Sequence, residues 1–245
     1  MASETSVKNA DGVEIWYDFD SSAKTASVTY KGSYYYYYDE YIGNVVIPSK
    51  VTYEGEEYSV TSIGKYAFYC CSFLTSITIP ESVTSIGEWA FNGCISLTSI
   101  TIPKGVTEIG DEAFSFCSSL TSITIPEGVT SIGVSAFSYC SSLTSITLPE
   151  SVTSIGSYAF SNCISLTSIT IPEGVTEIRY DAFGECCKLY EVYNKSNLTI
   201  TAGSSENGGV AYYAYNVYTD KSGESKLHTV GDYIFYVDED YNYIK

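Results

Sequence analysis

The sequence predicts an α/β-type repeat solenoid, built from short parallel strands with brief helical turns and capped at both ends. One observation is the pattern Leu-Thr-Ser-Ile-Thr-Ile-Pro (Leu for the second Ile in one unit), which recurs every 23 residues. Its starts are Leu74, Leu97, Leu120, Leu143 and Leu166. A second observation is that Val-Thr-Ser/Glu-Ile, then Ala-Phe, then Cys follow at fixed offsets. Such a period indicates one supersecondary unit stacked in series.

The first predicted element of each unit is a short strand near residues 76–79. Ile77 and Ile79 are two residues apart, which is the spacing that places side chains on one face of a strand. Ser76 and Thr78 alternate outward. The strand must end at the next proline, because proline cannot donate a ladder hydrogen bond. These prolines are Pro80, Pro103, Pro126, Pro149 and Pro172.

A second extended segment is predicted at residues 83–86, and a glycine follows it. Gly87 predicts a turn with a left-handed backbone, after which a single helical or 3₁₀ turn places Ala90 and Phe91 inward. The equivalent glycines are Gly110, Gly133 and Gly156. Arg179 interrupts this series in the fifth unit, so either the turn tolerates a side chain or the coil is distorted there.

The full repeat, Leu-x-x-Ile-x-Ile-Pro-x-x-Val-Thr-x-Ile-Gly-x-x-Ala-Phe-x-x-Cys, resembles that of the BspA-like leucine-rich repeat proteins, a family largely of bacterial surface and secreted proteins. The resemblance covers about residues 44–192, and residues 44–48 and 58–64 resemble the family's opening segment. It implies a right-handed solenoid with the first strand on the concave side. It also implies, more weakly, adhesion to host matrix proteins, other bacteria or innate immune receptors, and it brings no residue-level binding motif.

Three zones divide the chain. Residues 1–43 are not repeated and predict an N-terminal β cap. Residues 44–192 predict the leucine-rich repeat solenoid. The pattern then decays, so residues 193–245 predict a C-terminal cap, or a linker to further turns, that contains a hairpin.

Hairpins are predicted in all three zones. Residues 13–19 and 26–30 predict an antiparallel strand pair around a polar turn. Glu54-Gly55-Glu56 predicts a hairpin turn that lengthens the first unit. Residues 233–237 and 241–244 predict the C-terminal hairpin.

The chain is strongly acidic, with a formal net charge of −17 and 12 basic residues. So few cations argue against a nucleic-acid surface and against binding to anionic membranes. We interpret the acidity mainly as repulsion that keeps an elongated monomer soluble, with a cationic partner or calcium as the alternative.

Membrane insertion is not expected, because no apolar stretch approaches the length of a membrane span. The N-terminal residues do not have the pattern expected of a signal peptide. A natural start at Met1 would indicate a cytosolic protein. The family resemblance instead favours a secreted or cell-surface protein whose leader has been removed, and this is the location that we predict.

Six of the eight cysteines share one repeat offset. They are Cys71, Cys94, Cys117, Cys140, Cys163 and Cys186. We predict buried free thiols, because equivalent side chains on stacked coils point inward side by side; disulfides between neighbouring coils are the alternative. Cys70 and Cys187 lie near opposite ends and are too far apart to pair. A metal cluster is not expected, since His228 is the only histidine.

No pattern of catalytic residues is present, and we predict neither an enzyme nor a cofactor. A cysteine nucleophile would need His228, which lies outside the repeats. Asp111 and Glu112 occupy outward positions typical of a solvated face. The segment 238–242 is spaced like the start of a calcium loop, but it lacks the required glycine, and a hairpin turn explains it better.

Two surfaces remain as candidate binding sites. The first is the concave row of paired hydroxyl residues. The alternative is that these residues only form a solvated sheet face that binds nothing. Our candidates there are Ser99, Thr101, Ser122, Thr124, Ser145 and Thr147. The second is aromatic: Tyr66 and Trp89 share one outward offset, and Phe116 and Tyr139 share another. Tyrosines also crowd residues 34–41, so some of those rings should face solvent.

These features predict a non-enzymatic binding or adhesion module that recognises a protein or glycan ligand, with host matrix proteins and receptors among the candidates. The first alternative is a structural spacer in a larger surface protein. An accessory domain of an enzyme is another. The regular Ser and Thr rows also resemble ice-binding surfaces, although mixed residues and the expected curvature disfavour that function.

Overall fold

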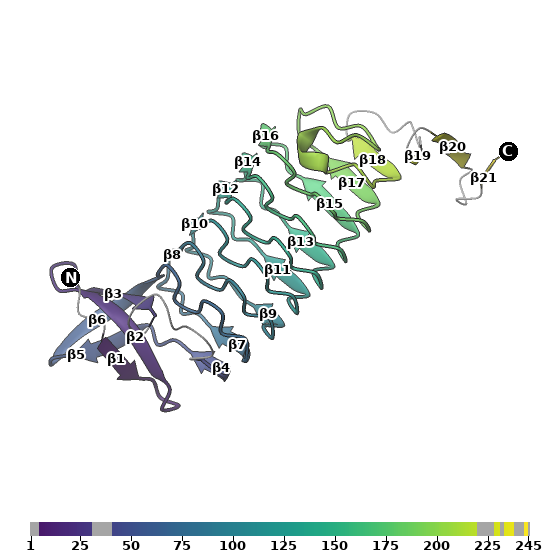
Figure 1. The fold of residues 1–245 in the computed structure, drawn as a ribbon. Helices are drawn as coiled ribbons and strands as arrows, with labels where there is room; N and C mark the ends of the chain where they lie inside the picture. The colour runs from purple at the N-terminus through teal and green to yellow at the C-terminus, as the bar shows by residue number, and fades with distance from the viewer. Residues whose placement is uncertain (1–4, 31–40, 220–227, 231–232, 238–242, 245) are drawn as a thin grey trace.

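The structure is a computed structural model that describes residues 5–30, 41–219, 228–230, 233–237 and 243–244. Successive coils stack along one axis, and the strands of each coil pair with those of its neighbours, so the molecule is an elongated rod (Figure 1). The predicted β-rich solenoid with short parallel strands is confirmed. Such a rod is held together by contacts between neighbouring coils rather than by one central core.

The first strand of each coil builds a parallel sheet along the rod. The strands β4 (Gly43–Val46), β7 (Leu74–Thr78), β9 (Ser99–Ile100), β11 (Ser122–Thr124) and β13 (Ser145–Thr147) form one sheet, and β15 (Ser168–Ile171), β17 (Glu191–Asn194) and β18 (Asn216–Thr219) form the next. The register joins residues one repeat apart, as in the pairing of Ser122 with Ser145. We call the outward side of these strands, with the residue before each strand, the first-sheet face.

The second predicted strand is also confirmed and builds a parallel ladder of its own. It has two sections: β8 (Ser85–Ile86) pairs with β10 (Glu108–Ile109), and β12 (Ser131–Ile132), β14 (Ser154–Ile155) and β16 (Glu177–Ile178) pair in a separate sheet. Ile86 pairs with Ile109, and both are buried. Each coil therefore contributes one strand to each of two ladders.

The predicted helical turn after the second strand is wrong. Among the described residues the only helix is the 3₁₀ element η1 (Asn207–Gly209), outside the five regular coils. The Phe91 N–H donates to the Ala113 carbonyl of the next coil at 2.8 Å, whereas the Ala90 N–H bonds back to Gly87 at 3.3 Å. A helix would direct every N–H to its own segment. Here alternate N–H groups bond to the next coil, so this segment forms consecutive turns instead of a helix.

The left-handed backbone that we predicted at Gly87 lies instead at Trp89, whose φ is 60°. Glycine is needed for another reason, because a Cβ at Gly110 would lie 2.5 Å from the Glu88 nitrogen of the preceding coil. At the equivalent position the Arg179 side chain is exposed, and its N–H still donates to the Ile155 carbonyl at 2.9 Å. The turn in the fifth unit therefore tolerates a side chain.

A column of phenylalanine rings runs through the interior. The rings stack with centroids 5.0–5.5 Å apart. They are Phe68, Phe91, Phe114, Phe137, Phe160 and Phe183, and all are fully buried. Tyr41 extends the column at its N-terminal end, 4.7 Å from Phe68. The inward prediction for Ala-Phe is confirmed.

The cysteine prediction is confirmed as well. All eight cysteines are free, and the six at the shared repeat offset are buried. Five of these thiols donate to a phenylalanine carbonyl of the preceding coil at 3.1–3.2 Å, as Cys140 does to Phe114. Cys70 is half-buried and Cys187 is exposed.

The N-terminal strands join the second ladder. The antiparallel strands β1 (Thr5–Lys8), β2 (Glu14–Asp20) and β3 (Thr25–Thr29) pair in order, and β3 lies parallel to β6 (Glu56–Ile63). The predicted strand pair is therefore confirmed. The predicted hairpin at Glu54 and Gly55 joins β5 (Lys50–Tyr53) to β6 and is also confirmed.

The parallel ladder continues past residue 192, where the consensus fades. β17 pairs with β15, and β18 pairs with β17. Beyond them, β19 (His228–Val230), β20 (Tyr233–Val237) and β21 (Tyr243–Ile244) pair antiparallel, which confirms the C-terminal hairpin. The calcium-like segment 238–242 lies outside the described residues.

Candidate functional site

The six predicted serine and threonine residues lie together on the first-sheet face. All six are exposed and come from neighbouring strands. Ser99, Thr101, Ser122 and Thr124 line a shallow hollow of about 440 Å³, with Glu81 at its edge. The structure therefore places these hydroxyls where a ligand could reach them.

Hydroxyls on this face have two different environments. Two threonines just before a strand donate to the preceding coil: Thr121 Oγ1 to the Thr98 carbonyl at 3.4 Å, and Thr144 Oγ1 to the Thr121 carbonyl at 3.2 Å. Within the described part of the chain, the hydroxyls of Ser122 and Thr124 have no protein partner. They can therefore donate to and accept from a ligand.

Tyr66 and Trp89 do not belong to this surface. They follow the second ladder, and both are half-buried. Tyr66 lies 6.1 Å from Trp89 and 5.6 Å from Tyr69, and it meets Tyr30 edge-on at 6.2 Å. This packing indicates an aromatic cluster that joins the N-terminal strands to the first coils, separate from the hydroxyl row.

The remaining predicted aromatics divide into two environments. Phe116 and Tyr139 are each 46% exposed and stack at 4.5 Å, so this pair does face solvent. Tyr41 is buried, and its hydroxyl accepts the Trp16 N–H at 3.3 Å. The tyrosines at 34–38 lie outside the described residues.

Two pairs of tyrosines on the first-sheet face were missed from the sequence. Tyr193 pairs with Thr170 on one side and with Tyr218 on the other, and the two rings stack at 4.8 Å. Tyr190 and Tyr215 stack in the same manner at 4.9 Å. One further 23-residue step from Leu166 to Leu189 could have revealed the first tyrosine of each pair.

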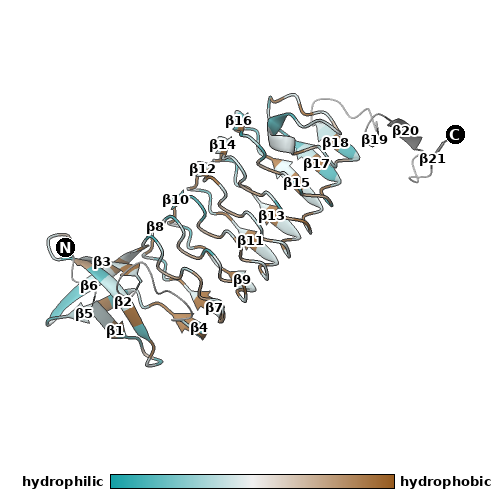
Figure 2. Cartoon of the chain, in the orientation of Figure 1, coloured by the Kyte–Doolittle hydropathy of each residue, from teal (hydrophilic) through white to brown (hydrophobic). Residues whose placement is uncertain are grey.

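The first-sheet face therefore changes character along the rod. Counting inward and outward residues together, the strands are more hydrophobic at β4 and β7 and more hydrophilic at β17 and β18 (Figure 2). In the five regular coils the outward residues are threonine and serine, whereas the next two carry tyrosine, glutamate and asparagine.

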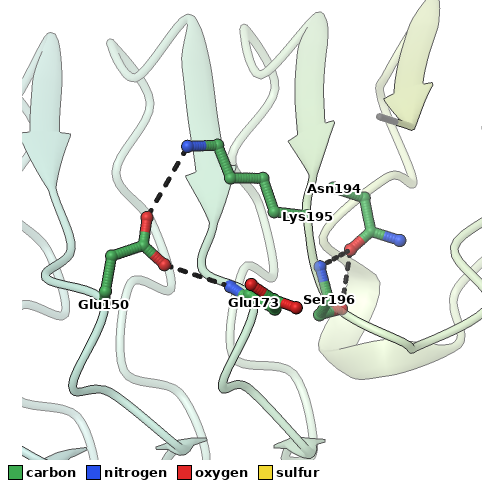
Figure 3. Close-up of polar contacts among 5 residues, drawn as sticks. All are labelled: Glu150, Glu173, Asn194, Lys195 and Ser196. Atoms are coloured by element: carbon green, nitrogen blue, oxygen red, sulfur yellow. Dashed lines mark hydrogen bonds and ion pairs between the residues drawn. The ribbon is translucent and has the colours of Figure 1, made fainter. Parts of the chain in front are cut away.

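A larger hollow of about 950 Å³ lies beside the ends of β17 and β18. Glu150 contacts the Lys195 ammonium at 3.6 Å and accepts the Glu173 N–H at 3.3 Å (Figure 3). Asn194 Oδ1 accepts two bonds from Ser196. These polar groups bond to one another, so the hollow offers few unpaired groups to a ligand.

The buried thiols are poor nucleophiles. Burial raises the pKa of Cys140, and likewise that of Cys186, from 9.0 to about 12. A reactive cysteine needs the opposite shift and access to solvent. In the described residues, no group of three or more His, Cys, Asp or Glu side chains is placed to hold a metal ion. No helix there is long and apolar enough to cross a membrane.

These features define the class of a leucine-rich repeat solenoid, with short parallel strands and a repeated Leu, Ile and Phe interior. The BspA type leucine rich repeat region matches residues 61–190 and 136–244, in 6 copies. The chain belongs to this family.

Solved structures of bacterial leucine-rich repeat proteins have the same fold. A leucine rich repeat protein of T. pallidum is 33% identical, with 78% of this chain and 83% of that chain covered and a TM-score of 0.66. A leucine rich cell surface protein of Faecalibacterium prausnitzii is 29% identical over 98% of this chain, with a TM-score of 0.57. This chain spans 60% of the length of that protein. A comparison with curated protein sequences gave no match.

Proposed function

We propose that the chain is a non-enzymatic binding module that recognises a protein or glycan ligand through the first-sheet face. The observation that carries this proposal is the hollow lined by Ser99, Thr101, Ser122 and Thr124. Neighbouring coils hold these exposed hydroxyls in fixed register, so a ligand meets a pre-organised row of donors and acceptors.

The family and a relative support a location at the cell surface. The F. prausnitzii protein is described as a leucine rich cell surface protein. A surface location suits a binding module that exposes a long row of polar side chains. We propose that this chain is displayed or secreted in the same way.

A structural spacer is the second candidate function. One observation favours it, namely that five coils repeat the same outward Thr-Ser-x-Thr tetrad. A spacer needs length and solubility rather than a distinct patch. The tyrosine pairs at the end of the face favour recognition instead.

Two bulky substitutions in one coil test the proposal. Thr124 and Thr130 are both exposed, but Thr124 lies on the first-sheet face and Thr130 precedes the second-ladder strand β12. The full chain and both variants, Thr124→Trp and Thr130→Trp, are applied to an array of matrix proteins and neutral glycans. Affinity for each bound probe is then measured by surface plasmon resonance.

We expect Thr124→Trp to weaken binding at least ten-fold and Thr130→Trp to change it less than two-fold. Equal affinity of both variants would show that the first-sheet face is not the binding surface. Failure of the wild-type chain to bind any probe would favour the spacer.

A further inference from the structure

The outward tetrad of the first-sheet face changes abruptly after the fifth regular coil. Residues 167–170 read Thr-Ser-Ile-Thr, whereas residues 190–193 read Tyr-Glu-Val-Tyr and residues 215–218 read Tyr-Asn-Val-Tyr. The three segments stack directly, since the Tyr190 N–H donates to Thr167 at 3.0 Å and the Tyr215 N–H donates to Tyr190 at 2.8 Å. The row of small hydroxyl side chains therefore ends directly against large tyrosine side chains.

The stacking geometry indicates which face of the Tyr193 ring is covered by Tyr218. Tyr193 and Tyr218 lie at equivalent positions of neighbouring strands, with planes within 13° and centroids 4.8 Å apart. This separation equals the spacing between strands, so the ring planes lie across the rod axis. Tyr218 covers one face of Tyr193. The other face points towards the shorter Thr170, and Tyr193 remains 39% exposed.

A second stacked pair, Tyr190 with Tyr215, lies beside the pair of Tyr193 and Tyr218, and we call Tyr193 and Tyr190 the two aromatic walls. Tyr190 is stacked on Tyr215 at 4.9 Å and 14°, and it lies just before β17, three positions before Tyr193. Three residues of extended chain span about 10 Å. Tyr190 and Tyr193, each stacked on a second tyrosine, thus lie side by side at the end of the row of serine and threonine residues.

Polar groups lie between the two walls. Glu191 accepts the Tyr193 hydroxyl at 3.0 Å, which fixes the tip of that ring. Asn216 pairs with Glu191 and is 7% exposed, and in the described part of the chain its Oδ1 has no hydrogen-bond partner. That oxygen is itself buried, so the polar group that a ligand can reach beside the Tyr193 ring is the half-buried Glu191.

This combination of groups favours a sugar over a protein surface. One face of a pyranose ring carries C–H groups that stack on an aromatic face, and its edge carries hydroxyls that bond to serine, threonine, carboxylate and amide groups. Docking of a protein would require a wider apolar centre than two ring faces beside short hydroxyl residues. The net charge of −17 and the Glu191 carboxylate disfavour acidic sugars.

We infer that Tyr190 and Tyr193, backed by Tyr215 and Tyr218, form a subsite for a neutral pyranose glycan that lies against Ser168 and Thr170. This inference rests on the proposed function, since it names the ligand class and the place of contact on the first-sheet face.

The test measures binding of neutral hexasaccharides of glucose, mannose and N-acetylglucosamine to the full chain by isothermal titration calorimetry, with hyaluronan hexasaccharide as the acidic control. Tyr193→Ala removes one wall, and Thr170→Trp fills the space before it. Tyr193→Phe keeps the ring. Phe116→Ala, which removes an equally exposed stacked aromatic elsewhere, is the matched control. Circular dichroism verifies that each variant is folded.

We expect at least one neutral hexasaccharide to bind. Tyr193→Ala and Thr170→Trp should each weaken it at least ten-fold, whereas Tyr193→Phe and Phe116→Ala should change it less than three-fold. If Tyr193→Ala failed to fold, Thr170→Trp would decide alone. The inference is overturned if no neutral hexasaccharide binds, if hyaluronan binds more tightly, or if the blocking variants bind like the wild type. Binding of a matrix protein that Thr124→Trp abolishes would then leave the proposed function standing.

Discussion

The five regular coils, residues 74–188, and the two segments that follow, residues 189–219, differ inside and outside, although β17 and β18 extend the strand ladder that β15 begins. The regular coils contain stacked phenylalanines and buried thiols, whereas Val210, Ala211 and Ala214 fill the interior of the later segment. The ladder nevertheless continues without a break in register, with Ile169 paired to Val192 and Val192 to Val217.

This difference shows that pairing of the strands does not depend on the phenylalanine and cysteine interior. Backbone pairing needs only an inward apolar residue at each strand centre, so it survives loss of the Phe and Cys positions. Outward residues contribute little to folding and can change freely. The tyrosine pairs arise where the repeat constraint relaxes, and this is where we place ligand recognition.

The largest expected effect lies in the interior of the regular coils. Phe137 stacks between Phe114 and Phe160 at 5.4 and 5.5 Å and is fully buried. Phe137→Ala should lower the free energy of unfolding by about 3–5 kcal/mol. Leu198→Ala, at a half-buried position in the later segment, should cost about 1–2 kcal/mol. Urea unfolding measures both, and equal losses would contradict the contrast between the two interiors.

The next effect concerns the close approach of regular coils. A Cβ at Gly110 would lie 2.5 Å from a backbone nitrogen, whereas a Cβ at Gly105 would meet nothing nearer than 3.6 Å. Gly110→Ala should therefore destabilise the protein by about 1–3 kcal/mol. Gly105→Ala should stay within about 0.5 kcal/mol. Thermal unfolding compares them, and a neutral Gly110→Ala would show that the coils can separate at little cost.

The buried thiols of the regular coils should make stability fall at alkaline pH. The pKa of Cys140 is about 12 in the folded protein, against 9.0 ordinarily. As pH rises through this window the unfolded chain releases the proton first, so stability is unchanged below pH 9 and falls between 9 and 12. One thiol contributes about 1.4 kcal/mol per pH unit.

Urea unfolding at pH 8 and pH 10 measures this slope. Cys140→Ala should make it shallower than in the wild type by that amount. Parallel slopes for the two proteins would mean that burial does not raise the pKa of the Cys140 thiol.

The smallest effect is expected on the outward face. Tyr193→Thr restores the regular tetrad and removes the stack on Tyr218, which should cost about 0.5–1.5 kcal/mol. Thr124→Ala on the regular face should stay within about 0.5 kcal/mol. Thermal unfolding checks both. A larger loss for Thr124→Ala would show that the hydroxyl row supports the fold.

The hairpins and both strands of the unit were predictable because they depend on local spacing and turn residues. Ile77 and Ile79 identified the first strand, and Glu54 and Gly55 identified a hairpin that the structure contains. The helical turn was mispredicted since a run such as Trp89-Ala90-Phe91 does not reveal that alternate N–H groups bond to another coil. The role of Gly87 was misjudged for the same reason.

The candidate site was predicted only in its regular half. Ser99, Thr101 and their equivalents follow directly from the repeat, whereas the packing of Tyr66 against Tyr30 does not. Tyr193 could have been reached by one more repeat step. Tyr218 could not, because it lies 25 residues beyond Tyr193 and only the strand register identifies it as the next member of the row.

The sequence by itself determined the period, the inward Leu, Ile and Phe positions and the burial of the thiols, because apolar spacing along a chain is a local property. Only the tertiary structure decided where the backbone turns left-handed, why glycine is required and which tyrosines stack. Those features depend on distances between coils, which are set by backbone pairing between segments remote along the chain.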